Sequence, residues 1–201
     1  MTLPEDFVAH ALRVLGDALL AIIVRADLHL KPGELTRSLA RRTARQMREL
    51  TLLIRRLIFL MALSVDLAPA KPRAPKARAV PAGEDVTASF GAARIGVRLV
   101  PAPARAFPDH LRTLSGPPRK ATVSAAPLLL RWIALNRVLT KPEQYAARLA
   151  RVIERWKAAR QPRPYVGPVP ARHRFGAQLG LTAGAVTDML RRALSDWPDT
   201  G

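Results

Sequence analysis

Residues 34–65 read ELTRSLARRTARQMRELTLLIRRLIFLMALSV and contain neither glycine nor proline. A run of this length without a helix breaker predicts one long helix. Its second half carries apolar side chains on nearly every face, so we expect other helices to surround it. One apolar seam follows alternating steps of three and four, the heptad-like spacing that suits a helical partner. The seam consists of Met47, Leu50, Ile54, Leu57 and Met61.

The first half of this helix is basic, with arginine at positions 41, 42, 45 and 48. We favour a helical hairpin with the preceding segment, because amphipathic helices usually bury their apolar stripe in a protein core. Its remaining apolar face would be covered by the C-terminal helices or by a second copy of the chain. The second case is a homo-oligomer through helix 34–65. A membrane surface is a further alternative partner, since apolar and arginine-rich faces together suit an anionic bilayer.

Helices are also predicted on both sides of this segment. Residues 5–26 repeat apolar side chains at three- and four-residue steps, after a proline at position 4 that suits a helix start. Residues 127–160 divide into two helices at Thr140-Lys-Pro-Glu143, which matches a capping box with Thr140 as the N-cap. The predicted fold class is therefore mainly α. Its parts are an N-terminal helical hairpin over 1–66 and a C-terminal helical segment over 127–201.

The middle of the chain has a different composition, with ten prolines between residues 66 and 127. No helix survives that density of proline, so residues 67–126 are predicted to be a basic, proline-rich linker. It is either a flexible arm that lies along a phosphate backbone or a solvated spacer that touches nothing. Alternating apolar residues at 94–99 predict one short strand, with 86–90 as the candidate partner in a small β-hairpin.

Charge is the strongest feature of the composition, because 33 basic residues against 15 acidic ones give a net charge of +18. Six of the basic residues are lysine, so 27 are arginine. Arginine suits bidentate phosphate contacts, and a strongly basic chain attracts polyanions. The competing explanation is codon bias, because GC-rich genomes enrich arginine, alanine, proline and glycine together.

Several classes of function lack their signatures in this sequence. Cysteine is absent, which excludes disulfides and thiolate metal sites, and the four histidines have no metal-ligand spacing. No phosphate-binding glycine loop, dinucleotide fingerprint, zinc-protease helix or nucleophile elbow is found. We expect no enzymatic activity, no metal and no cofactor. We also expect a cytoplasmic protein, because the first residues lack a signal-peptide charge pattern and no charge-free apolar run approaches the roughly 20 residues that span a bilayer.

Residues 172–194, RHRFGAQLGLTAGAVTDMLRRAL, predict two short helices separated by a turn. Gly180 is placed where the first helix must stop, since glycine adopts a left-handed backbone without steric cost. Thr182 then suits the N-cap of the second helix. Apolar residues on either side repeat at helical spacing and give each helix one apolar face.

This pattern resembles the bacterial helix-turn-helix motif, in the version found in region 4 of sigma factors and in related response regulators. The resemblance covers about a tenth of the chain. It rests on Gly176, Leu179, Gly180, Leu181, Val186 and Met189.

The resemblance implies a DNA-binding, regulatory protein whose second motif helix enters the major groove. The implied nucleic-acid-binding residues are Arg172, Arg174, Thr182, Thr187, Arg191 and Arg192. One departure from the family weakens base recognition: Ala183 and Gly184 offer a base almost no contact, and Asp188 repels phosphate. The alternative function is a self-associating helical scaffold protein, with an anionic membrane surface as a further candidate partner.

Overall fold

A computed structural model describes residues 4–67, 121–169 and 175–197. The strands predicted at 86–90 and 94–99, and nearly all of the predicted linker, lie outside these described residues. Within the described ranges the structure is a helical bundle with one small sheet, so the mainly α fold class is confirmed. The helices are α1 (Glu5–Arg25), α2 (Arg37–Ser64), α3 (Ala126–Thr140), α4 (Pro142–Ala158) and α5 (Ala177–Ala193), with a short 3-10 helix at Leu28–Leu30.

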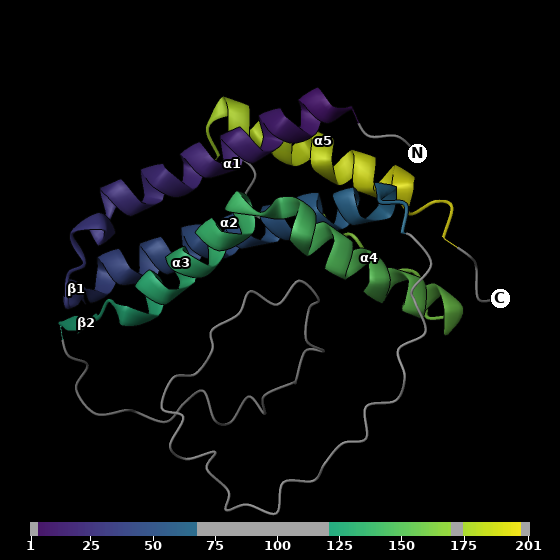
Figure 1. Cartoon of the computed structure of the whole chain (residues 1–201). Coiled ribbons are helices and arrows are strands. Elements are labelled where there is room, and N and C mark those ends of the chain that lie inside the picture. The colour runs from purple at the N-terminus through teal and green to yellow at the C-terminus, as the bar shows by residue number, and fades with distance from the viewer. Residues whose placement is uncertain (1–3, 68–120, 170–174, 198–201) are drawn as a thin grey trace, which may run out of the picture.

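The long helix α2 runs through the middle of the bundle (Figure 1). Helices α1 and α5 lie on one side of it, and α3 and α4 lie on the other. Met47, Ile54 and Leu57 of the predicted seam have no exposed surface, and Leu50 is buried as well. The hairpin covered by the C-terminal helices is therefore confirmed. The chain's own helices occupy this seam, so a homo-oligomer through helix 34–65, which stays a prediction, would use another face of α2.

One hydrophobic core joins the two predicted helical segments. Side chains from α1 and α2 share this core with side chains from α3, α4 and α5, so the described parts of the two predicted helical segments pack together. Helix α1 is also long and apolar enough, by length and composition alone, to cross a bilayer. In this fold its inner face lies in the shared core, through residues that include Leu15, Leu19 and Ile23.

A two-stranded antiparallel sheet, absent from the sequence prediction, joins the starts of α2 and α3. Strand β1 (Glu34–Thr36) pairs with β2 (Thr122–Ser124), with Leu35 opposite Val123. Helix α2 consequently begins at Arg37, where Thr36 is the N-cap and accepts a hydrogen bond from the Leu39 backbone N–H at 3.4 Å. The capping role predicted for Thr140 is wrong. Thr140 is still part of α3 and donates its hydroxyl to the Asn136 carbonyl at 2.8 Å.

The turn predicted at Gly180 is also wrong, because α5 is one continuous helix from Ala177 to Ala193. The backbone N–H of Gly180 donates to the Gly176 carbonyl at 2.9 Å, and Thr182 lies inside the helix instead of capping it. Glycine costs a helix interior only about 1 kcal/mol. Packing of α5 against α2 and α1 outweighs that cost, since Val186 and Leu190 are buried in the shared core.

Replacing Gly180 by alanine tests the continuous helix. An added Cβ would have the Phe175 Cβ as its nearest neighbour at 3.9 Å, which is ordinary van der Waals contact. Gly180→Ala should therefore raise the free energy of unfolding by about 0.5–1 kcal/mol, as measured by urea denaturation. Gly16→Ala in α1 is the matched control, because its Cβ would meet no described atom within 4 Å. A loss of stability at Gly180 beside a gain at Gly16 would indicate a left-handed turn at Gly180.

Candidate functional site

The two threonines predicted to contact DNA are buried inside the protein. Thr182 is 6% exposed and donates its hydroxyl to the Gln178 carbonyl at 2.9 Å. Thr187 is 4% exposed and donates to the Ala183 carbonyl at 2.7 Å. A base edge has no access to either hydroxyl in this structure, so the exposed position predicted for both residues is wrong. The reason is that the face of α5 that was expected to enter the major groove packs against α2 and α1 instead.

Arg56 of α2 donates a hydrogen bond to the buried Thr187. Its side chain is 8% exposed and makes two hydrogen bonds, from Nη1 to the Thr187 hydroxyl at 2.8 Å and from Nη2 to the Gly167 carbonyl at 2.7 Å. Burial lowers the pKa of Arg56, and the nearby charge of Arg191 lowers it further. Neutral acceptors thus hold this buried cation, and it links α2 to α5 and to the segment before α5.

The four arginines predicted as DNA contacts have different outcomes. Arg172 and Arg174 lie outside the described residues. Arg191 and Arg192 are exposed near the end of α5, but both interact with their own chain. Arg191 lies 3.7 Å from the Asp188 carboxylate and donates to the Val166 carbonyl at 3.3 Å. Arg192 donates to the Asp188 carbonyl at 3.4 Å.

Three other arginines meet where α2 packs against α3, and we call Arg48, Arg55 and Arg131 the basic cluster. Arg48 and Arg55 are two turns apart on one face of α2, and Arg131 comes from α3. Burial lowers the pKa of Arg55, and the charge of Arg131 lowers it further. Burial and the charge of Arg48 have the same effect on the pKa of Arg131. Arg55 and Arg131 remain cations in spite of this lowering, because a guanidinium group is not deprotonated in proteins.

The basic cluster has no counter-charge in the described part of the chain. None of its members forms an ion pair there with a carboxylate, and the buried Nε of Arg55 has no hydrogen-bond partner. Helix α3 contains no acidic residue, and the only acid of α2, Glu49, is 3.2 Å from Arg45. Like charges that are partly removed from water raise the free energy of the folded state. A bound anion would lower it.

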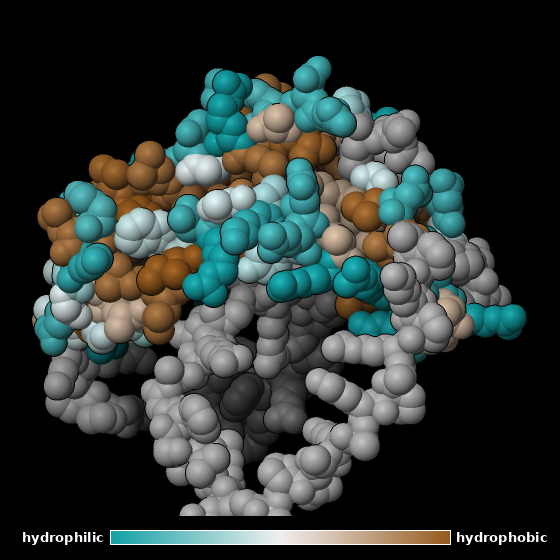
Figure 2. Space-filling model, viewed as in Figure 1, coloured by the Kyte–Doolittle hydropathy of each residue, from teal (hydrophilic) through white to brown (hydrophobic). Residues whose placement is uncertain are grey.

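A second set of arginines lies on the solvent side of α4, and we call Arg148, Arg151 and Arg155 the arginine row. Their spacing places them on one helix face, opposite the buried residues of α4. The guanidinium of Arg148 lies 5.8 Å from the ring centroid of Tyr145. Figure 2 shows hydrophilic side chains over α4 on the face that is in view. The row thus presents three exposed cations in sequence along the helix.

Sequence reasoning missed the basic cluster because its members come from two distant segments. Arg48 was recognised as part of a basic patch, but Arg131 was not singled out. A signal was present, since Arg131 is three residues after Leu128 and four before Leu135, and both leucines are buried. An arginine at that spacing lies near the core-facing side of its helix.

No metal site was expected. The described residues contain no group of three histidine or acidic side chains that would hold a metal ion. No protein-family model matches the chain, and the chain matches no curated protein and no solved structure. Evidence about its function therefore comes from its own side chains.

Replacing Thr187 distinguishes a structural role from a DNA contact. Thr187→Val keeps the shape of the side chain but removes the hydroxyl that accepts from the buried Arg56. We expect a loss of about 1–3 kcal/mol in the free energy of unfolding, because a buried charged donor loses its acceptor. Thr187→Ser keeps the hydroxyl and should retain most of the stability. Urea denaturation measures both effects.

Thr182→Val is the matched control, because the Thr182 hydroxyl is buried but bonds only within its own helix. Its cost should be well under that of Thr187→Val. Equal stability of all three variants, with weaker DNA binding in Thr187→Val alone, would contradict the structural role of Thr187.

Proposed function

We propose that the protein binds nucleic acid through contacts of the basic cluster with backbone phosphates. The observation that carries this proposal is that Arg48, Arg55 and Arg131 lie together without a carboxylate partner among the described residues. Arginine suits this role because its planar fork of donors matches the oxygens of a phosphate group. A phosphate would also give the buried Nε–H of Arg55 the acceptor that it lacks.

The arginine row supports a polymeric ligand over a single small anion. Three exposed cations recur along α4 at intervals of roughly 5 Å, which suits a ligand that carries repeated negative charges. The net charge of +18 adds a long-range attraction to any polyanion.

The proposed binding is non-enzymatic and depends little on base sequence. The hydroxyls of Thr182 and Thr187 form hydrogen bonds inside the protein. Phosphate contacts carry no sequence information by themselves. This differs from the regulatory role that the helix-turn-helix resemblance implies, because such a role requires base recognition by α5.

A double substitution in the basic cluster tests this proposal. Arg48→Gln with Arg131→Gln removes two cations and leaves the half-buried Arg55 in place. In fluorescence anisotropy with a random-sequence duplex, we expect affinity to fall by about tenfold or more. The slope of log affinity against log salt should fall in magnitude by about 2, because each lost phosphate contact contributes roughly 0.9.

Arg191→Gln with Arg192→Gln is the matched control, since it removes the same charge from the exposed end of α5. We expect this variant to keep most of the affinity and nearly the full salt slope. A larger loss in the α5 variant would place the nucleic acid on α5. Equal losses would show that only the net charge matters.

A second candidate function, docking at an anionic membrane surface, is supported by exposed apolar side chains on α1 and the turn that follows it. Leu20 is 59% exposed, Val24 is 51% exposed and Leu30 is 71% exposed. The membrane-binding surface is therefore proposed on α1 and not on helix 34–65, because the apolar side chains of α2 are mostly in the core. Arg25 and Lys31, which are exposed and next to these residues in sequence, would add attraction to anionic lipids.

Replacing Leu20 and Val24 by glutamine tests this second candidate. Loss of two inserted side chains should weaken co-sedimentation with phosphatidylglycerol vesicles by at least tenfold, since each buried apolar side chain contributes about 1.5–3 kcal/mol. Leu181→Gln is the control, because Leu181 is 70% exposed but lies on α5. Vesicle binding that is unchanged in the α1 variant would exclude this surface.

A further inference from the structure

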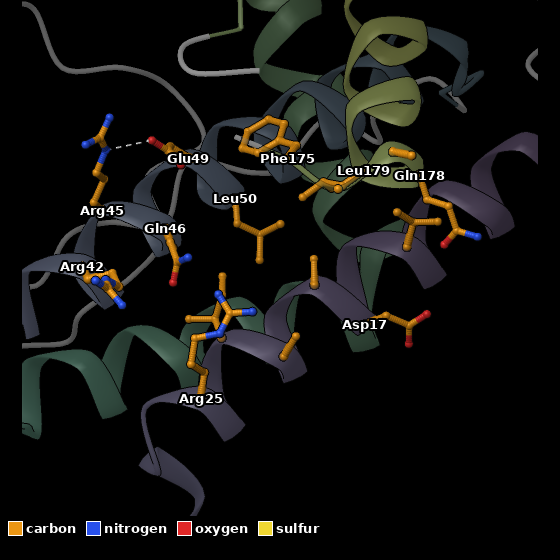
Figure 3. Close-up of a pocket in the computed structure, with 16 residues that line it drawn as sticks. Asp17, Arg25, Arg42, Arg45, Gln46, Glu49, Leu50, Phe175, Gln178 and Leu179 are labelled. Carbon is orange, nitrogen blue, oxygen red and sulfur yellow. Dashed lines mark hydrogen bonds and ion pairs between the residues drawn. The ribbon is translucent and has the colours of Figure 1, made fainter. Parts of the chain in front are cut away.

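An open groove lies between α1 and the first half of α2, beside the start of α5 (Figure 3). It has a volume of about 800 Å³, within the range of small-molecule sites. It exists because α5 begins only at Ala177, close to the middle of α2. Beyond that point α5 no longer covers the seam between α1 and α2.

The part of the groove next to α5 is apolar. Val14 of α1 and Leu50 of α2 line it, together with Phe175, just before α5, and Leu179 near the start of α5. In Figure 3, Leu50 points from α2 into the groove, and Phe175 and Leu179 lie near it at the end of the groove next to α5. This part suits a hydrocarbon group, because an apolar ligand that enters it leaves water.

The other end of the groove is cationic. Arg25 of α1 and Gln46 of α2 point toward one another across the groove, and Arg42 lies one turn before Gln46 on the α2 wall (Figure 3). Neither Arg25 nor Arg42 forms an ion pair with a carboxylate of the described residues. Arg25 is in the last turn of α1, where the helix dipole stabilises a positive charge. The dipole of α1 does not explain the second cation, Arg42, on the facing wall.

The two acids of the groove do not neutralise this end. Glu49 is engaged by Arg45, whose Nε lies 3.2 Å from the Glu49 carboxylate. Asp17 is two turns before Arg25 on α1, roughly 12 Å along the helix axis, and it points away from Arg25 (Figure 3). The charge that remains for a ligand is positive, and it lies at the end opposite the apolar part.

We propose that this groove binds a free, monomeric long-chain carboxylate. Its carboxylate lies between Arg25 and Arg42, where each guanidinium offers paired donors, and its hydrocarbon chain follows α1 toward Val14 and Leu179. Arg25 and Val14 are roughly 16 Å apart along the axis of α1, comparable to an extended chain of about twelve carbons. This site is separate from the basic cluster, so the inference does not depend on nucleic-acid binding.

Isothermal titration calorimetry of the full chain with dodecanoate, below its critical micelle concentration, tests this proposal. We expect saturable one-to-one binding that weakens at least tenfold when Arg25 and Arg42 are both replaced by glutamine. Dodecan-1-ol and dodecyltrimethylammonium should bind at least tenfold more weakly, because they lack the carboxylate. Ala21→Trp should abolish binding, since Ala21 lines the groove and is exposed, so the larger ring occupies the space.

Arg13→Gln with Arg41→Gln is the matched control for charge and should leave the affinity unchanged, because neither residue lines the groove. Circular dichroism checks that each variant is folded. Tight binding of dodecanoate by folded Ala21→Trp would overturn the proposal. Equal affinity for the three amphiphiles would overturn it as well, and so would binding to phosphatidylglycerol vesicles without binding of monomeric dodecanoate.

Discussion

Helix α2 is surrounded by the other helices and yet carries seven arginines. Its packing favours apolar side chains, while its charges require water or polar partners. A charge that is removed from water costs free energy unless polar groups replace its hydration. Arg41, Arg42 and Arg45 avoid the cost by reaching solvent along the first half of the helix. Arg56 avoids it differently, since the Thr187 hydroxyl and the Gly167 carbonyl accept its hydrogen bonds. The hydrogen bond from Arg56 to Thr187 also links α2 to α5.

Within the described part of the chain, the Nε of Arg55 neither reaches solvent nor has a hydrogen-bond acceptor. Burial lowers the pKa of Arg55, and the charge of Arg131 lowers it further. A fold that needed only stability would gain from an apolar residue at this position or at Arg131. Retention of like charges without a counter-ion is the property that an anion-binding surface requires.

Local sequence pattern predicted the parts of the fold that depend on local physics. Residues 34–65 and 5–26 have helical periodicity and no internal proline, so α2 and α1 followed from the sequence with small shifts at their ends. The β1–β2 pairing did not, because three-residue strands are too short for an alternating pattern and Glu34 and Thr122 are 88 positions apart. The turn predicted at Gly180 is wrong because glycine permits a turn but does not require one.

The candidate site was less predictable, since its partners are distant in sequence. Thr187 became a buried acceptor only because Arg56 lies 131 positions earlier in the chain and opposite it in space. Arg131 joined the basic cluster through the packing of α3 on α2. Composition predicted a polyanion ligand, and the helix-turn-helix resemblance placed it on residues 172–194. The structure instead leaves unneutralised charge on α2 and α3.

Side-chain NMR of the arginine Nε–H groups shows which arginines contact nucleic acid, because it observes each guanidinium during binding. We predict that a short random-sequence duplex shifts the resonances of Arg48, Arg55 and Arg131. The signal of Arg55 should change most, since its Nε–H gains a first hydrogen-bond partner, while Arg191 and Arg192 change little. Large shifts of Arg191 and Arg192, with the basic cluster unchanged, would contradict the account and return the nucleic acid to α5.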